Sequence, residues 1–198
     1  MMKITTYEEL NKYVKAFSND NFNLLIIKSK GGLSKSQLLK QYAKDSIFFR
    51  GHATPLSIFL KLQENSRRKV IFDDVDELIK NKGNISILKQ LTETTKIKEV
   101  QYNTTSQAMQ PDKQSFMSRN KICLLVNDIK RIGHNMQALL TRGFYIDFCP
   151  SNQEIMNKLK ELNEIMRGFG FANDISLKNN TFEIEIGAYK PASFLLIN

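Results

Sequence analysis

The sequence predicts an α/β fold in which helices cover both faces of a five-stranded parallel sheet. Two observations support this class. Short, nearly continuous apolar runs, such as LLII at 24–27 and ICLLV at 122–126, are typical of strands buried on both faces. Segments with apolar residues at helical spacing separate these runs along the chain, and this alternation is the one that a parallel sheet requires.

Local signals support the individual elements. Residues 7–17 place apolar side chains at helical spacing, and Pro55 stands near the start of a later helix. A further strand at 98–103 stays open. The predicted strands are 21–29, 46–51, 69–78, 121–128 and 144–148, and the predicted helices are 7–17, 34–44, 54–66, 84–94 and 134–142.

The chain is expected to divide into a core domain, residues 1–150, and a short C-terminal part, residues 151–198. After Pro150 a serine cap is followed by one amphipathic helix. The remaining segment alternates apolar and polar residues like strands, with a hairpin turn at the two asparagines, 179–180. Its role stays open between covering the sheet, pairing with another chain and being a degenerate tail.

Charge and composition limit the possible partners. The 198 residues include 29 Lys plus Arg and 20 Asp plus Glu, a net charge of +9. Residues 151–198 hold five basic and six acidic residues, which leaves +10 in residues 1–150. A basic domain attracts polyanions, of which DNA is the common example, although lysine-rich codon usage also raises basicity.

The sequence also predicts where the protein is located and the redox state of its two cysteines. No apolar run reaches the length of a membrane span, and the N-terminus shows no secretion signal. We therefore expect a cytoplasmic protein with no membrane contact. Cys123 and Cys149 lie in apolar runs without metal-ligand spacing, so we expect reduced thiols in the core.

The segment IIKSKGGLSKSQLLKQYA, 26–43, resembles a phosphate-binding loop between a strand and a helix. Such a loop aims backbone N–H groups at phosphate oxygens, with a lysine on the β and γ oxygens and a hydroxyl on Mg²⁺. The candidate binding residues are Gly31, Gly32, Ser34, Lys35 and Ser36, the last also a candidate Mg²⁺ ligand. The alternative is a plain strand–turn–helix connection, because serine stands at position 34 where the motif has glycine.

Three more polar groups follow later strands or helices in the order that triphosphate chemistry needs. Asp73 and Asp74 end an apolar strand and suit a Mg²⁺ ligand and a water-activating carboxylate. Asn127 ends the next strand and suits a γ-phosphate sensor, and Arg142 suits stabilisation of transferring phosphate. If the five predicted strands are numbered along the chain, the strand ends that carry these polar residues meet only when the sheet has the order 5-1-4-3-2. Alone, the acids could form a solvated turn and Arg142 could serve a helix end.

Together these motifs resemble the AAA+ class of P-loop ATPases, and within it the small ATP-binding proteins of phages, plasmids and integrated mobile elements. The family patterns GGLGKS, VIDDVDGL, SRVAIIAND and DRGxxxxFxP are similar to GGLSKS, VIFDDVDEL, SRNKICLLVND and TRGFYIDFCP here, over about residues 23–155. The resemblance implies ATP at Lys35 and Ser36, and Mg²⁺ at Ser36 and Asp73. It also implies water activation near Asp74, sensing by Asn127 and a finger role for Arg142, with Arg119 a second candidate for action in trans.

The chain departs from that family at Ser34 and in the helical lid, which one helix after Pro150 would replace. The leading hypothesis is an AAA+ ATPase that acts on DNA or a DNA-bound partner as a replication, helicase-loading or remodelling factor of a mobile element. It would work with other proteins of that element as a homo-oligomeric ring or filament. The alternatives are a non-hydrolysing scaffold that binds nucleotide or nucleic acid, and a structural protein that has lost the site.

Overall fold

The computed structural model of the protein describes residues 1–73, 78, 81–103, 114–127, 133–168, 173–178 and 181–186. The chain divides into two compact units. Residues 1–4 and 8–148 form the first, and residues 5–7 and 149–198 form the second.

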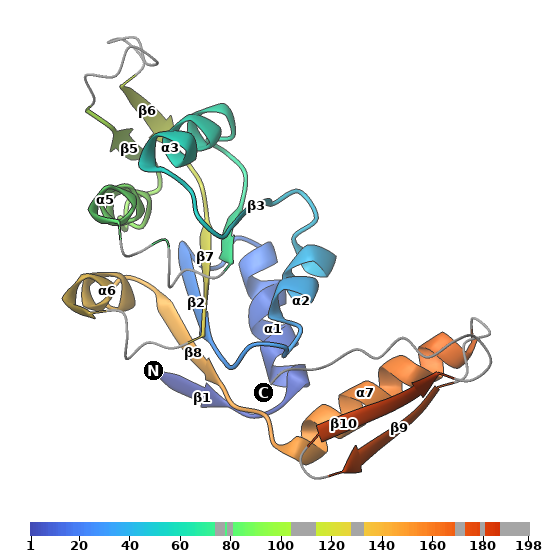
Figure 1. Ribbon diagram of the computed structural model, residues 1–198. Coiled ribbons are helices and arrows are strands. Elements are labelled where there is room, and N and C mark those ends of the chain that lie inside the picture. Colours follow the sequence, from blue (N-terminus) through green and yellow to red (C-terminus); the bar gives the residue numbers. More distant parts are fainter. Residues whose placement is uncertain are drawn as a thin grey trace. The chain divides into compact units, whose positions relative to one another are not determined.

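A six-stranded parallel sheet forms the centre of the first unit (Figure 1). The strand order is β1-β8-β2-β7-β4-β3. Five of these strands have the predicted order, with β7 between β2 and β4, so this part of the prediction is confirmed. The prediction of five strands in all is wrong, because β1 pairs in parallel with β8 at the edge. The strands are β1 (Met2–Ile4), β2 (Leu24–Lys28), β3 (Ile47–Arg50), β4 (Val70–Asp73), β7 (Ile122–Val126) and β8 (Phe144–Phe148).

Helices cover both faces of this sheet, as predicted. Alternate residues of a strand point to opposite faces, so Leu24 and Ile26 of β2 share a face with Leu124 of β7. That face packs against α3, α5 and α6 in one buried cluster. Helices α1 and α2 lie on the other side (Figure 1). The helices are α1 (Tyr7–Ser18), α2 (Lys35–Tyr42), α3 (Pro55–Glu64), α5 (Lys82–Leu91) and α6 (Gly133–Leu140).

Capping side chains fix where two of these helices start. Thr54 accepts a hydrogen bond from the Ser57 N–H at 3.2 Å, and Pro55 occupies the first turn of α3, where it removes no helical hydrogen bond. Asn81 accepts a hydrogen bond from the Gly83 N–H at 2.8 Å at the start of α5. The predicted position of Pro55 near a helix start is therefore confirmed.

A two-stranded antiparallel pair, β5 (Lys98–Gln101) with β6 (Ser115–Ser118), packs against α5 and α3. The open prediction of a strand at 98–103 is confirmed, whereas β6 was not predicted. Phe116 meets Phe59 of α3 edge to face, with ring centroids 5.1 Å apart. The Lys98 side chain is only 1% exposed, and its Nζ donates a hydrogen bond to the Asn120 carbonyl at 2.8 Å.

Burial of Lys98 gives the protein a pH-dependent stability that Lys98→Met should remove. Burial, and next the charge of Lys121, lower the pKa of Lys98 from 10.5 to about 8. Between those values the unfolded chain binds more protons than the folded chain, so this group's contribution to the free energy of unfolding rises with pH. From pH 7 to 10, wild type should gain stability relative to Lys98→Met in denaturant titrations. Exposed Lys96→Met is the control and should track wild type; parallel curves for Lys98→Met would contradict the prediction.

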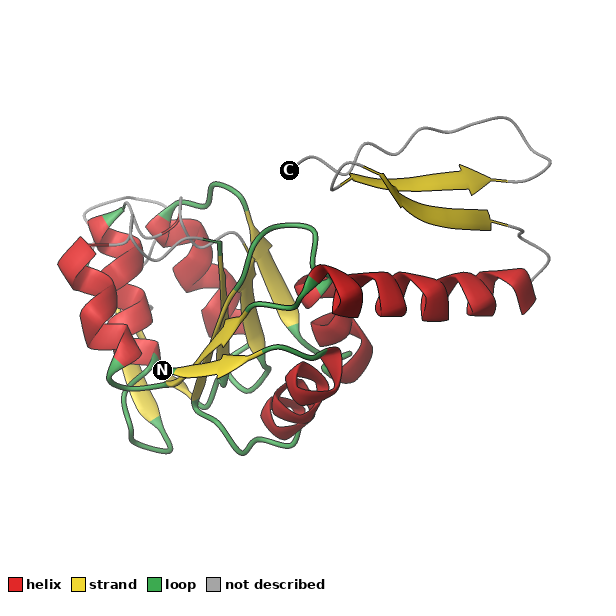
Figure 2. Cartoon of the chain, turned by 90° about the horizontal axis from the view of Figure 1, so that it is seen from below, coloured by secondary structure: helices red, strands yellow, loops and turns green. Residues whose placement is uncertain are grey.

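The second unit contains one long helix, α7 (Asn152–Gly168), and an antiparallel pair, β9 (Asn173–Lys178) with β10 (Thr181–Ile186). Figure 2 shows the helix in red and the two strands in yellow. The predicted helix after Pro150 and the strand-like character of the tail are confirmed. The predicted turn at 179–180 lies outside the described residues.

The described residues test the predictions about membrane contact and about the two cysteines. In that part of the chain, no helix is both long and apolar enough to cross a membrane. Cys123 is buried in β7, as predicted, but Cys149 is exposed, so the prediction of two core thiols is wrong for Cys149. The reason is its position: it follows the last residue of β8, where the chain leaves the sheet.

Candidate functional site

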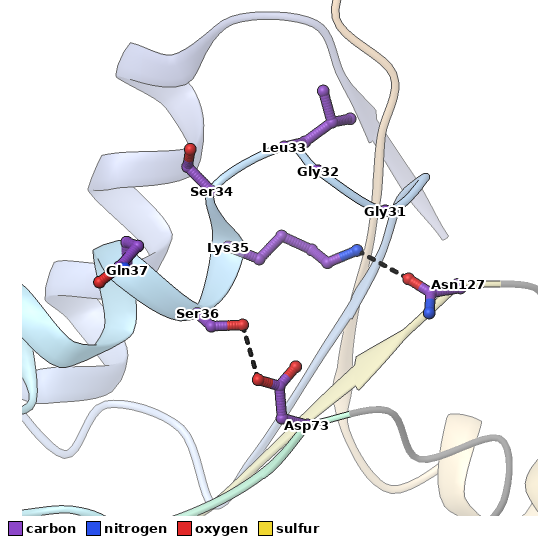
Figure 3. A pocket seen from close by; sticks show the side chains of 9 residues that line it. All are labelled: Gly31, Gly32, Leu33, Ser34, Lys35, Ser36, Gln37, Asp73 and Asn127. Atoms are coloured by element: carbon purple, nitrogen blue, oxygen red, sulfur yellow. Dashed lines mark hydrogen bonds between the residues drawn. The ribbon is translucent and has the colours of Figure 1, made fainter. Parts of the chain in front are cut away.

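A pocket of about 480 Å³ lies at the carboxyl ends of β2, β4 and β7 (Figure 3). In an open parallel sheet, ligands bind at this end of the strands, because the loops there are free to form a site. The lining residues are Gly31, Gly32, Leu33, Ser34, Lys35, Ser36, Gln37, Asp73 and Asn127. All five predicted loop residues therefore lie in one pocket together with Asp73 and Asn127.

The loop between β2 and α2 forms one side of the pocket. The Ser29 N–H donates to the Val126 carbonyl at 3.0 Å, which extends the β2–β7 pairing by one residue and fixes where the loop begins. Gly32 has φ +78°, a backbone conformation that glycine adopts without strain. A Cβ built on Gly31 or Gly32 meets no atom within 4 Å, so the loop backbone borders open space.

Ser34 adopts a left-handed backbone conformation, φ 56° and ψ 16°, directly before α2. For a residue with a Cβ this conformation costs about 1–2 kcal/mol. Its side chain forms no hydrogen bond with the helix N-terminus. The loop therefore has the backbone shape that a glycine at this position would allow without strain, and the serine is accommodated at a cost in stability.

Ser34→Gly should raise the free energy of unfolding by roughly 0.5–1 kcal/mol. Removing the Cβ relieves the strain, and the greater freedom of glycine in the unfolded chain offsets part of the gain. Denaturant titration measures this change, and titration with Mg-ATP should show binding at least as tight as in wild type. Ser34→Ala is the matched control, because it removes the hydroxyl but keeps the Cβ. Equal stability of the two variants would contradict strain as the cause.

Lys35, the first residue of α2, turns its side chain back under the loop (Figure 3). The residue is 7% exposed, and Nζ donates to the carbonyl oxygens of Ser29 at 2.8 Å and Lys30 at 3.1 Å. A third bond, at 3.2 Å, goes to Oδ1 of Asn127. The ammonium is thus held at the centre of the pocket by loop carbonyls and by the residue that follows β7.

Ser36 and Asp73 lie side by side in the pocket (Figure 3). The Ser36 hydroxyl donates to Oδ2 of Asp73 at 2.8 Å (Figure 3). A hydroxyl and a carboxylate are hard oxygen ligands, and Mg²⁺ typically combines one or two such protein ligands with phosphate oxygens and water. The two predicted metal ligands therefore fit that ion by chemistry and by proximity.

Arg50 is a neighbour of this pair that sequence analysis missed. It ends β3 directly beside Asp73 in the parallel register, and its Nε lies 3.4 Å from Oδ2 of Asp73. The side chain of Arg50 is half exposed, so the pair is only weakly stabilising. A basic residue at the end of the predicted strand 46–51 was the available signal. Leu33 of the loop and Gln37 of α2 also line the pocket, and neither carried a signal beyond its place in the sequence.

Beneath the pocket, Cys123 is fully buried in β7. Burial, and secondarily the negative charge of Asp73, raise the pKa of its thiol above the ordinary value. The thiol is therefore uncharged at neutral pH and unreactive, because the thiolate is the nucleophilic form. Cys123 acts as an apolar core residue and contributes no nucleophile to the site.

Two predicted arginines lie away from this pocket. Arg142 is exposed, and its Nη1 donates to the Lys89 carbonyl at 2.7 Å in the last turn of α5. Arg119 is exposed and precedes β7, at the end of the sheet opposite the pocket. In the part of the chain that the structure describes, neither residue lines the pocket. Asp74, the predicted water-activating carboxylate, lies outside the described residues.

Comparison with known proteins adds no relative: no family model and no curated protein sequence matches the chain.

Proposed function

We propose that the protein is a Mg-ATP-binding ATPase of the AAA+ class. The observation that carries this proposal is the meeting of Lys35, Ser36, Asp73 and Asn127 around one pocket, at the carboxyl ends of three adjacent strands of a sheet with the expected order. Any one of these residues has an ordinary structural role. Their joint placement at the carboxyl end of the sheet supports triphosphate binding.

Each pocket residue would have a separate role in the binding of Mg-ATP. Backbone N–H groups of the loop and the N-terminus of α2 would bind phosphate oxygens, and Lys35 would move from the loop carbonyls to the β and γ oxygens. Ser36 and Asp73 would hold Mg²⁺, which neutralises phosphate charge when bound. Asn127, already bonded to Lys35, would contact the γ-phosphate, and Asp74 is the candidate to orient water.

The proposed cellular role is action on DNA or on a DNA-bound partner of a mobile element. The protein would act in the cytoplasm and as an oligomer. The excess of basic residues in 1–150 supports the DNA part of this proposal. The sequence resemblance to small ATP-binding proteins of such elements supports the rest.

A non-hydrolysing scaffold is the second candidate. Serine at position 34, where the motif has glycine, favours it. The bond between Arg142 and the end of α5 also favours it, because it holds that arginine away from the pocket of its own chain. Such a protein would bind Mg-ATP as a structural ligand and release no phosphate.

Phosphate release and nucleotide binding, measured on the same sample, separate these candidates. The purified chain is titrated with Mg-ATP in a calorimeter, and phosphate release is followed without DNA, with single-stranded DNA and with duplex DNA. The proposal expects binding in the pocket and hydrolysis that DNA increases. Binding without hydrolysis under all three conditions would support the scaffold, and absence of binding would overturn both candidates.

A further inference from the structure

The end of the sheet opposite the pocket carries four basic residues, which we call the basic edge: Arg67, Arg68, Arg119 and Lys121. They precede β4 and β7, whereas the pocket residues follow β2 and β7 or, for Asp73, end β4. Figure 1 shows the α3–β4 and β6–β7 connections at one end of the strands and the loop into α2 at the other. The five residues of β7 rise about 3.3 Å each, so roughly 15 Å separates the two ends.

A buried asparagine fastens the two segments of the basic edge to each other. Asn120 is fully buried, and its Nδ2 donates to the carbonyls of Asn65 at 2.7 Å and Arg68 at 2.6 Å. The Arg119 N–H adds a bond to the Ser66 carbonyl at 2.7 Å. Two of these bonds run from the Asn120 side chain to backbone carbonyls and the third joins two backbone groups, so together they fix the frame from which the basic side chains project.

Two acidic residues, Asp20 and Asp45, lie beside the basic edge, but the described residues show no ion pair between either of them and its arginines. Arg67, Arg68 and Arg119 are exposed, and within the described residues none of the three forms an ion pair. The Nε of Arg68 donates to the Asp45 carbonyl at 2.7 Å, which orients its guanidinium without neutralising it. The adjacent Lys69, which is not part of the basic edge, pairs with the carboxylate of Asp20 at 2.9 Å. The basic edge therefore presents a positive potential on a rigid frame.

We propose that the basic edge binds the sugar-phosphate backbone of a nucleic acid. Guanidinium groups bind phosphates through two parallel N–H donors, and several on one rigid frame suit a polymer that repeats its charge. This inference rests on the proposed function for the choice of nucleic acid over other polyanions. It adds the location of contact: a surface of the chain separate from the nucleotide pocket.

The test compares Arg67→Gln/Arg119→Gln with Lys3→Gln/Lys160→Gln, which removes the same charge at two exposed lysines elsewhere. Binding of fluorescent 30-nucleotide single-stranded and duplex DNA is followed by anisotropy over a series of salt concentrations. Two lost phosphate contacts should weaken binding about 10- to 100-fold at 0.1 M salt and reduce the slope of log K against log salt by about two. The lysine control should bind within about threefold of wild type. Excess Mg-ATP should not displace the DNA.

Each outcome bears on a definite conclusion. Equal losses in the two double variants, displacement by Mg-ATP, or no DNA binding by wild type would overturn the basic edge as a site. Calorimetric Mg-ATP binding by the arginine variant confirms that its pocket is folded. DNA binding that maps to the basic edge without any ATP hydrolysis would leave this inference standing and contradict the proposed ATPase. ATP hydrolysis by wild type, together with unchanged DNA binding by the arginine variant, would contradict the basic edge and leave the proposed ATPase standing.

Discussion

Lys35→Ala is expected to weaken Mg-ATP binding at least hundredfold. The ammonium sits at the centre of the pocket, and hydrogen bonds to charged groups contribute about 1.5–3 kcal/mol each, so the loss of two such bonds to phosphate oxygens amounts to about 3 kcal/mol or more. Isothermal titration with Mg-ATP measures the loss directly.

Two controls separate loss of charge from damage to the loop. Lys35→Met keeps the length and burial of the side chain but removes the bonds to Ser29 and Asn127, and it should bind as poorly as Lys35→Ala. Lys30→Ala removes a neighbouring exposed lysine whose backbone carbonyl, and not its side chain, contacts Lys35, so it should bind within a few-fold of wild type. Wild-type affinity in Lys35→Met would show that the pocket is not a triphosphate site.

Arg142→Ala is expected to retain Mg-ATP binding and lose about 10³-fold or more in hydrolysis, as removal of an arginine finger does. Arg142 lies outside the pocket of its own chain, so the proposal requires it to act on the nucleotide of a neighbouring copy. Its exposed bond to the Lys89 carbonyl contributes only about 1 kcal/mol and does not prevent such a change of partner. Steady-state phosphate release against protein concentration is the measurement.

Mixing experiments distinguish action in trans from a local structural role. An equimolar mixture of Arg142→Ala and Lys35→Ala should recover activity, because some interfaces then combine an intact loop with an intact arginine. If Arg142 only caps α5, Arg142→Lys should restore stability and hydrolysis together, since a lysine also interacts well with a helix C-terminus. A mixture that stays inactive while wild type is active would contradict the trans role.

The order of strands was predictable because the chemistry constrained it. Three polar strand ends, after β2, β4 and β7, suit one site only if β7 lies between the other two, and it does. The edge strand β1 was missed because three residues with one buried side chain, Ile4, give no periodicity. The short strand β6 was missed for a similar reason, since two of its four residues are serine.

Other features of the site depend on tertiary structure and were not predictable. The sequence marked Ser34 as a departure from the motif, but a left-handed serine leaves no trace in composition or spacing. The partner of Arg142 is the carbonyl of a residue 53 positions earlier in the chain, a contact that only the packed fold defines. Arg50 reaches Asp73 because β3 and β4 pair in parallel with these two residues in register.

The central position of β2 has a consequence for how the protein is made. Its two sheet partners, β7 and β8, begin at Ile122 and Phe144, about a hundred residues after β2 itself. A ribosome adding about 5–20 residues per second needs several seconds to supply them. During that interval the apolar residues 24–27 have no neighbouring strand, so a nascent chain interrupted before residue 122 is expected to associate with chaperones or aggregate. The loop after β2 is thus synthesised early, yet it acquires its folded shape only when the last third of the core has left the ribosome.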